Sequence, residues 1–318
     1  MKVWIEVSNS PQVQLFSKVI QELRNKGFEI LVTARKYGFL EDLLNRKGIE
    51  FISLGKHGGS SLRSKLLEGT KRAIELTKLI SREKPDVLIF KHSPEAARVA
   101  FGLKIPSLCL VDNELASAHN KLVLNISTRV LAPKVTAESL SEYESIEFRT
   151  FNGVFELAHV YGEEIPEEIT NNIIIRPEPR KAEYFKSKRK LTSEKLVKIC
   201  PSGYRPLEIS RDLEKTLEDG IRLISSSALL IGTGGTMNRE AALLGVPNIA
   251  VELMDFPSVT KLLISKRLIK KITPEGLTKD LLVNTIMERR RLKKRAESVI
   301  KSMENPIPRI IDEVEHLT

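Results

Sequence analysis

The sequence is poor in cysteine, and it lacks long apolar runs. Its two cysteines, Cys109 and Cys200, fall in apolar stretches that predict buried positions in strands and give no disulfide or metal-ligand spacing. No stretch approaches the length of a membrane span, and the first residues read as a strand rather than as a signal peptide. These absences predict a cytoplasmic protein in a reducing compartment.

Aromatic residues are also scarce, at 5% of the chain, although the net charge is +10. Basic side chains gather in Phe185–Lys190 and in Glu288–Arg295 with almost no aromatic residue among them. Single-stranded nucleic acid is usually held by stacking on aromatic rings, so this pattern argues against nucleic acid as a partner. We expect Glu288–Arg295 to be mainly a solvated helix face. Weak peripheral attraction to the acidic inner face of a membrane is the alternative.

Short apolar strands alternate with amphipathic helices over the first 135 residues. The first strand covers Lys2–Ser8, and the helix after it ends at Gly27. Such alternation predicts an α/β fold, with a parallel sheet covered by helices on both faces and ligands bound at the carboxyl ends of its strands. A less regular, Glu-rich connection from Thr136 to Thr170 follows. At 318 residues, a second domain is expected.

The second half of the chain carries a smaller α/β pattern. Strands are expected in the segments that begin at Asn172, Lys195, Leu229 and Asn248. From Pro274 onward the sequence predicts mostly helix, with a break at Asn305–Pro308.

A glycine-rich turn stands out in "LLIGTGGTMNREAALLGVP". We expect a strand over Leu229–Ile231, an N-cap at Thr236 and a helix over Met237–Leu244. The glycines before that helix allow positive φ and leave its N-terminus uncovered, which suits an anion such as a phosphate. The alternative is a plain tight turn with Arg239 and Glu240 in solvent.

Polar residues follow several strands of the first domain. His57, His92, Asp112 and Glu114 are all expected at the carboxyl edge of the sheet. Groups of intermediate pKa gathered there favour acid–base chemistry. Their spacing matches no metal site.

The segments "VSNSPQVQLF", "GKHGG", "VDNELASAHNKL", "IIIRPEPRKAEY" and "EDGIRLISSSALLIGTGGTMNREAALLGVP" together resemble the largely archaeal domain-of-unknown-function 354 family. That family is similar to glycosyltransferases of the GT-B fold and to the non-hydrolysing UDP-N-acetylglucosamine 2-epimerases. The resemblance implies two Rossmann-like domains facing across a cleft. Residues 1–160 form the first domain, 161–303 the nucleotide-sugar domain, and 304–318 a helix that returns toward the first domain.

The same resemblance implies a glycosyltransferase that uses a UDP- or GDP-sugar bound in the cleft, with an unknown acceptor, no cofactor and no metal. The alternatives are a nucleotide-sugar 2-epimerase and a binding protein without catalysis. By residue matching, Gly234, Gly235 and Thr236 meet the diphosphate and Glu240 holds the ribose hydroxyls. Arg239 either neutralises phosphate or anchors the helix, and Arg176 adds a phosphate contact.

One loop departs from the family. Relatives usually read Asn-Ala-Pro-His-Val-His where this chain has Asn9 to Gln14, so both histidines are glutamine here. Asn9 stays a candidate substrate-binding residue. Because Gln12 and Gln14 cannot exchange a proton near neutral pH, Asp112 and Glu114 become the leading catalytic candidates, followed by His57 and His92.

Overall fold

The computed structural model describes residues 1–59, 61–163, 166, 168–178, 191, 193–209 and 220–318, and these form two compact units. The first unit comprises 1–153 and 305–318, and the second comprises 154–304. The boundary expected at residue 160 thus lies seven residues late, because helix α7 (Glu156–Val160) packs against helix α10 of the second unit. The last helix, α14 (Pro306–Glu315), groups with the first unit.

The first unit is built on a seven-stranded parallel sheet in the order β3-β2-β1-β4-β5-β6-β7. The strands are β1 Lys2–Val7, β2 Glu29–Lys36, β3 Ile52–Lys56, β4 Val87–Phe90, β5 Ser107–Leu110, β6 Arg129–Pro133 and β7 Phe148–Phe151. The alternation of strands and helices predicted this parallel sheet. The sequence order reverses between β1 and β4, where such sheets place their binding crevice.

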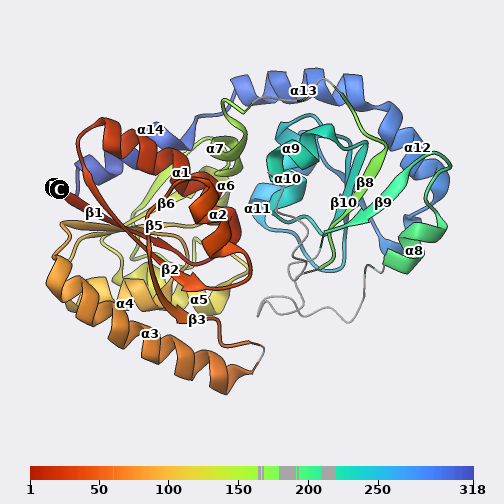
Figure 1. Ribbon diagram of the computed structural model, residues 1–318. Helices are drawn as coiled ribbons and strands as arrows, with labels where there is room; N and C mark the ends of the chain where they lie inside the picture. The colour runs from red at the N-terminus through yellow and green to blue at the C-terminus, as the bar shows by residue number, and fades with distance from the viewer. Residues whose placement is uncertain (60, 164–165, 167, 179–190, 192, 210–219) are drawn as a thin grey trace. The chain divides into compact units, whose positions relative to one another are not determined.

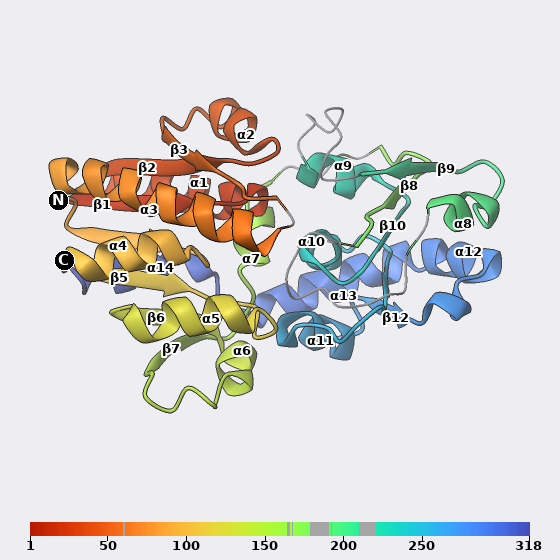
Figure 2. The same cartoon turned by 90° about the horizontal axis from the view of Figure 1, so that it is seen from below.

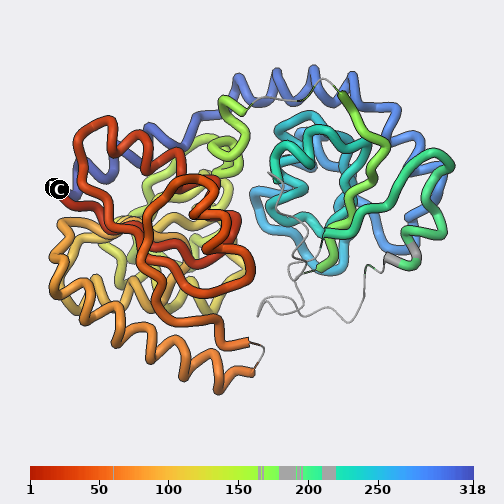
Figure 3. The backbone as a smooth tube through the Cα atoms, viewed as in Figure 1, coloured from red at the N-terminus to blue at the C-terminus, as the bar shows by residue number. Residues whose placement is uncertain are grey.

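Helices cover both faces of this sheet (Figures 1 and 2). Helices α1 (Ser10–Asn25) and α14 pack together on one face, and α3 (Leu62–Glu83), α4 (Pro94–Gly102) and α5 (Ser117–Val123) lie on the other. Shorter elements are α2 Leu40–Arg46, the 3-10 turn η1 Leu124–Ile126 and α6 Lys134–Ser139. Figure 3 shows the two ends of the chain side by side, since α14 returns beside α1.

Alternating side chains of each strand fill the two faces. Trp4, Leu88 and Phe90 join the core beneath α3 and α4, together with Cys109 of β5. Burial raises the pKa of the Cys109 thiol to about 12, so this cysteine is the inert core residue that the sequence predicted.

The second unit contains a five-stranded parallel sheet in the order β12-β11-β10-β8-β9. The strands are β8 Asn172–Ile175, β9 Arg205–Glu208, β10 Leu229–Gly232, β11 Asn248–Val251 and β12 Lys270–Ile272. Ile173 and Ile175 of β8 face one core, and Ile174 faces the other. This alternation places helices against both faces of the sheet.

The helices of this unit connect and extend its sheet. They are α7, α8 Ser193–Lys198, α9 Gly220–Ser226, α10 Thr236–Leu243, α11 Ser258–Ser265, the 3-10 turn η2 Pro274–Gly276, α12 Lys279–Met287 and α13 Arg289–Lys301. No helix within the described ranges is long and apolar enough to cross a membrane.

Three sequence expectations are corrected. The segment from Lys195 forms helix α8 and a turn instead of a strand, so Cys200 follows a helix. A short apolar run fits either structure, and here the helix covers the sheet. The connection expected from Thr136 to Thr170 contains strand β7 and helices α6 and α7. Strand β12 was missed because Lys270 and Lys271 break its apolar pattern. The basic segment Phe185–Lys190 lies outside the described residues.

Candidate functional site

The glycine turn of the second unit follows β10, the strand where the order of the second sheet reverses. Gly234 has φ +78°, and its N–H donates to Oδ1 of Asn238 over 3.0 Å. A Cβ on Gly234 would lie 2.5 Å from the Phe256 ring, so no larger residue fits there. A Cβ on Gly235 would meet no heavy atom within 4 Å. Open space therefore lies beside the end of the turn.

Helix α10 begins at Thr236, and Gly235 occupies the N-cap position. The sequence placed the N-cap one residue later, at Thr236. The Thr236 hydroxyl instead accepts a hydrogen bond from Nη2 of Arg239 at 3.2 Å, and no side-chain cap bond is formed. A glycine caps without covering the first N–H groups, so the positive end of the helix dipole stays accessible to an anion.

Arg239 is buried and forms an ion pair with Glu156 of α7. Its Nη2 lies 2.6 Å from Oε1 of Glu156, and its Nε lies 2.8 Å from the same oxygen. The guanidinium also donates to the Thr260 hydroxyl at 3.2 Å. The structure therefore supports the anchoring role for Arg239. Its position inside the unit contradicts the alternative that left it in solvent.

Glu240 is likewise buried, and it lies beside His159 of α7. Nδ1 of His159 is 2.8 Å from Oε1 of Glu240. The other oxygen, Oε2, forms no hydrogen bond with the residues that the structure describes. His159 thus fixes the carboxylate while leaving one oxygen to accept further bonds. This partner could not be predicted from local sequence, because the two residues are 81 positions apart.

Arg176 follows β8, the neighbour of β10 in the sheet. Its Nη1 donates to the backbone oxygen of Ile209 at 2.8 Å, and its Cβ lies 3.5 Å from the Cβ that Gly232 would carry. Arg176 therefore lies beside the start of the glycine turn.

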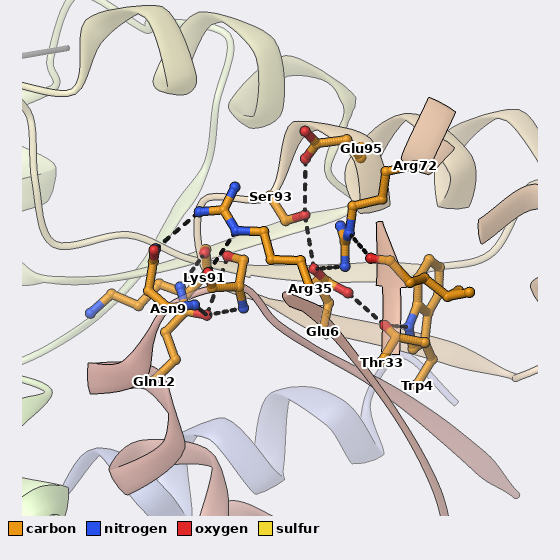
Figure 4. Close-up of polar contacts among 12 residues, drawn as sticks. Trp4, Glu6, Asn9, Gln12, Thr33, Arg35, Arg72, Lys91, Ser93 and Glu95 are labelled. Carbon is orange, nitrogen blue, oxygen red and sulfur yellow. Dashed lines mark hydrogen bonds and ion pairs between the residues drawn. The ribbon is translucent and has the colours of Figure 1, made fainter. Parts of the chain in front are cut away.

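In the first unit, the loop after β1 is held by Gln12 (Figure 4). Oε1 of Gln12 accepts from the backbone N–H groups of Ser8 at 2.7 Å and Asn9 at 3.2 Å, and Nε2 donates to the oxygen of Lys91 at 2.8 Å. Three bonds from one buried amide join the ends of β1 and β4. This position has a structural role that glutamine performs without exchanging a proton.

Asn9 and Arg35 meet at the same edge. Arg35, near the end of β2, donates from Nη2 to Oδ1 of Asn9 at 3.1 Å and from Nε to the Ser8 oxygen at 2.8 Å. Burial lowers the pKa of Arg35, although Glu95 and Glu6 act in the opposite direction. Arg35 was not among the predicted site residues, although its position just before the end of a strand was a usable signal.

A buried network lies beneath this edge. Oε1 of Glu6 is 2.7 Å from Nη2 of Arg72 and 3.3 Å from the Ser93 hydroxyl, and Oε2 accepts from Thr33 at 2.5 Å. Thr33 in turn accepts from Nε1 of Trp4 at 2.7 Å. Figure 4 shows these side chains converging from β1, β2, α3 and the loop after β4. The network supports the loops that carry the candidate residues.

Asp112, after β5, is buried and paired with Lys91 after β4. Nζ of Lys91 lies 2.7 Å from Oδ2 of Asp112. Glu114 belongs to the same loop, and its backbone oxygen accepts from Nδ2 of Asn120 at 3.3 Å. Asn120 is fully buried and also binds the Asn113 oxygen, so α5 holds this loop in place.

His92 lies next to Lys91 and has φ +53°. Its Nε2 is 3.1 Å from Oδ1 of Asn120. Burial lowers the pKa of His92 to about 4, with Lys91 acting in the same direction and Asp112 against it. His92 is therefore neutral near pH 7, and since the amide oxygen accepts, its Nε2 carries the proton.

His57 lies elsewhere on the edge, after β3. Its ring stacks on Tyr37 at 4.3 Å between centroids, and Nδ1 accepts from the Gly59 N–H at 3.0 Å. The structure thus brings Asp112, His92 and the Asn9 loop together around Lys91, and it places His57 on the neighbouring strands with Arg35. Among the described residues, no group of acidic, histidine or cysteine side chains is arranged to hold a metal ion.

Comparisons with known proteins agree with this architecture. The solved structure of a UDP-GlcNAc 2-epimerase from Neisseria meningitidis, bound to UDP-GlcNAc, has a TM-score of 0.67 at 16% identity, and all of both chains is covered. The UDP-GlcNAc 2-epimerase of Methanocaldococcus jannaschii, in complex with UDP-GlcNAc and UDP, has a TM-score of 0.65 at 17% identity over 99% of this chain and 100% of the other. The solved structure of a glycotransferase of kitacinnamycin has a TM-score of 0.67 at 14% identity, and the match covers 99% of this chain and 98% of the other. The fold is therefore the GT-B fold of glycosyltransferases and epimerases, as predicted.

Sequence relatives identify the family. An uncharacterized protein of Methanocaldococcus jannaschii is 36% identical over 294 residues, which cover 84% of this chain and 86% of the relative. The sequence pattern of the family described as "Protein of unknown function (DUF354)" matches residues 1–317. The chain belongs to that family.

Proposed function

We propose that this protein is a glycosyltransferase whose second unit binds a nucleoside-diphosphate sugar. The observation that carries the proposal is the open space beside Gly235 at the start of α10, where no side chain caps the helix. Phosphate oxygens bind well at such a helix start, because its N–H groups have no partners within the helix and its dipole is positive there. Gly235 leaves room for them.

Glu240 supplies the second part of the proposed nucleotide site. It lies within the first two turns of α10, and His159 holds one of its oxygens at 2.8 Å. The remaining oxygen accepts hydrogen bonds from ribose hydroxyls. A carboxylate fixed in this way forms stronger bonds than a neutral acceptor. The similar folds that were solved with UDP-GlcNAc or UDP support the choice of a nucleotide ligand.

For the transfer itself, we assign the base to Asp112. The acceptor hydroxyl gives its proton to the Asp112 carboxylate, and its oxygen bonds to the anomeric carbon of the sugar. The bond from that carbon to the diphosphate oxygen breaks, and the electron pair leaves with the diphosphate. The Lys91 ammonium, 2.7 Å away, offsets the cost of burying the carboxylate. His92, being neutral, contributes hydrogen bonds.

An epimerase is the second candidate. It is favoured by the likeness to UDP-GlcNAc 2-epimerases and by the grouping of Asp112, Lys91 and His92, because epimerisation needs groups that give and take protons. Incubation with UDP- and GDP-sugars distinguishes the candidates. Transfer or hydrolysis releases free nucleotide, while epimerisation produces only an altered sugar. A protein that binds without any turnover would contradict both.

Two glycine variants test the nucleotide site directly. In Gly235→Ala, the new methyl group enters open space at an ordinary φ of −80°, so we expect an unchanged melting temperature. The methyl crowds the phosphates, and calorimetric titration of UDP should show affinity reduced about 10-fold, which corresponds to roughly one charge-assisted bond. The control, Gly234→Ala, forces φ +78° on alanine beside Phe256, and we expect it to destabilise the protein. Unchanged UDP affinity in Gly235→Ala would contradict the proposed site.

Glu240→Gln provides an independent check. It weakens the bonds to ribose, and we expect UDP affinity to fall about 10- to 100-fold. The melting temperature falls as well, because the buried contact with His159 loses its charge. Lower stability with unaltered affinity would restrict Glu240 to a structural role.

A further inference from the structure

The start of helix α3 carries a group of apolar side chains that the described residues leave largely exposed. Leu62 is 74% exposed, Leu66 is 72% exposed and Leu67 is 49% exposed, whereas the first buried residue of this 22-residue helix is Arg72. Figure 1 shows the beginning of α3 at the margin of the first unit, with α4 beside its later turns. The first two turns of α3 and more therefore bury no side chain in the core of the first unit.

Two of the exposed leucines, Leu62 and Leu66, continue the apolar stripe of the helix. Leu76 and Ile80 are buried in the core of the first unit, and helical periodicity places Leu62 and Leu66 on the same side, about three to five turns earlier. A soluble surface usually places charged residues there. Clustered exposed apolar side chains of this size mark an interaction surface.

Basic residues lie close to these leucines in the sequence. Between residues 51 and 71 the chain carries Lys56, Arg63, Lys65 and Lys71, and Glu68 is the only acidic residue. Glu68 pairs with Lys71 at 3.1 Å, so its charge is already balanced. Ser61 caps the helix by accepting from the Ser64 N–H, which fixes the helix from its first turn. The start of α3 is thus a preformed helix with exposed leucines and more basic than acidic residues.

We propose that the first turns of α3 bind the surface of an anionic membrane, with Leu62, Leu66 and Leu67 entering the boundary between head groups and acyl chains. Leucines bounded by lysine and arginine are the pattern of helices that lie in this interface. A second copy of the chain is a poorer occupant, because symmetric pairing through this patch would bring the same basic residues together. The inference does not depend on the proposed sugar transfer.

Vesicle sedimentation with the full chain tests the proposal. The probes are extruded vesicles of phosphatidylcholine alone and of phosphatidylcholine mixed with phosphatidylglycerol. We expect the protein to bind the mixed vesicles and to dissociate with added salt. In Leu62→Ser/Leu66→Ser, we expect the partition coefficient to fall about 10-fold or more, since two apolar side chains no longer enter the interface. Arg63→Gln/Lys65→Gln should weaken binding only to the mixed vesicles.

The matched control is Leu122→Ser/Met287→Ser, which changes two apolar side chains on other helices that are 58% and 77% exposed. We expect it to bind vesicles like the unaltered protein, and all variants should keep the same melting temperature because none of the positions is buried. Absence of vesicle binding, or equal loss in the control, would overturn the proposal. So would a dimer in solution that only Leu62→Ser/Leu66→Ser dissociates, since this would identify a second copy as the occupant.

Discussion

At the scale of single residues, His92 makes stability depend on pH. In the unfolded chain it takes up a proton near pH 6.5, but in the folded protein only near pH 4, because burial disfavours its charge. The unfolded state therefore binds more protons between these values. The stability is complete above about pH 6.5 and is lost as the pH falls toward 4, by about 3 kcal/mol at this site.

The variant His92→Asn isolates this contribution. Asparagine tolerates the positive φ of 53° and does not titrate, so we expect its stability to fall less steeply across the same pH window. Urea unfolding followed by the fluorescence of Trp4, the only tryptophan and a residue of the first unit, measures both proteins. Identical pH slopes would show that His92 is not held neutral.

At the scale of elements, the buried pair of Glu6 and Arg72 joins β1 to α3. Glu6→Gln leaves the guanidinium buried without its counter-charge, and we expect the free energy of unfolding to fall by about 3 kcal/mol. Arg72→Met should lower the free energy of unfolding by a similar amount, because it leaves the Glu6 carboxylate buried without its counter-charge. The double variant should lose less than the sum, with a coupling of about 0.5–3 kcal/mol. Urea unfolding monitored by Trp4 fluorescence gives the free energy of unfolding of the unaltered protein, the two single variants and the double variant.

The exposed neighbour Lys71 provides the control for that cycle. Lys71→Met should change the free energy of unfolding by less than about 0.5 kcal/mol, as surface positions usually do. Additive losses in Glu6→Gln and Arg72→Met would mean that the two side chains do not stabilise each other.

At the scale of the whole molecule, the basic helix α13 was expected to be a solvated face. Arg290, Arg291, Lys293 and Lys294 are exposed. Arg289 departs from this expectation. Its guanidinium donates to the backbone oxygens of Ser225 and Ser227, both at 2.6 Å, and thereby caps the end of α9.

We therefore expect α13 to stabilise the second unit and not to bind nucleic acid. Arg289→Ala should lower the melting temperature, because it removes bonds to two carbonyl oxygens at a helix end. Arg290→Ala, which changes an exposed neighbour, should not. Fluorescence anisotropy with a labelled single-stranded RNA should show no tight, salt-sensitive binding in either protein. Strong binding that Arg290→Ala abolishes would identify a different partner class.

Much of this architecture follows from the local sequence. The strands β1 to β6, the alternating helices and the glycine turn before α10 were predictable, because each rests on apolar periodicity or on turn chemistry within a few residues. Strand β12 and helix α8 escaped prediction, because Lys270 and Lys271 hide an edge strand and the run at Lys195 fits either structure. The same local signals placed Asp112 and His92 at one sheet edge.

The fold class, the inert core cysteine and the glycine turn thus follow from local sequence, since each needs only neighbours along the chain. The roles of the charged residues, in contrast, depend on how distant segments pack together. Arg239 meets Glu156, Glu240 meets His159 and Arg72 meets Glu6 across 83, 81 and 66 positions. A buried charge needs a partner, but periodicity carries no information about which distant residue supplies it. That choice is made when the helices pack.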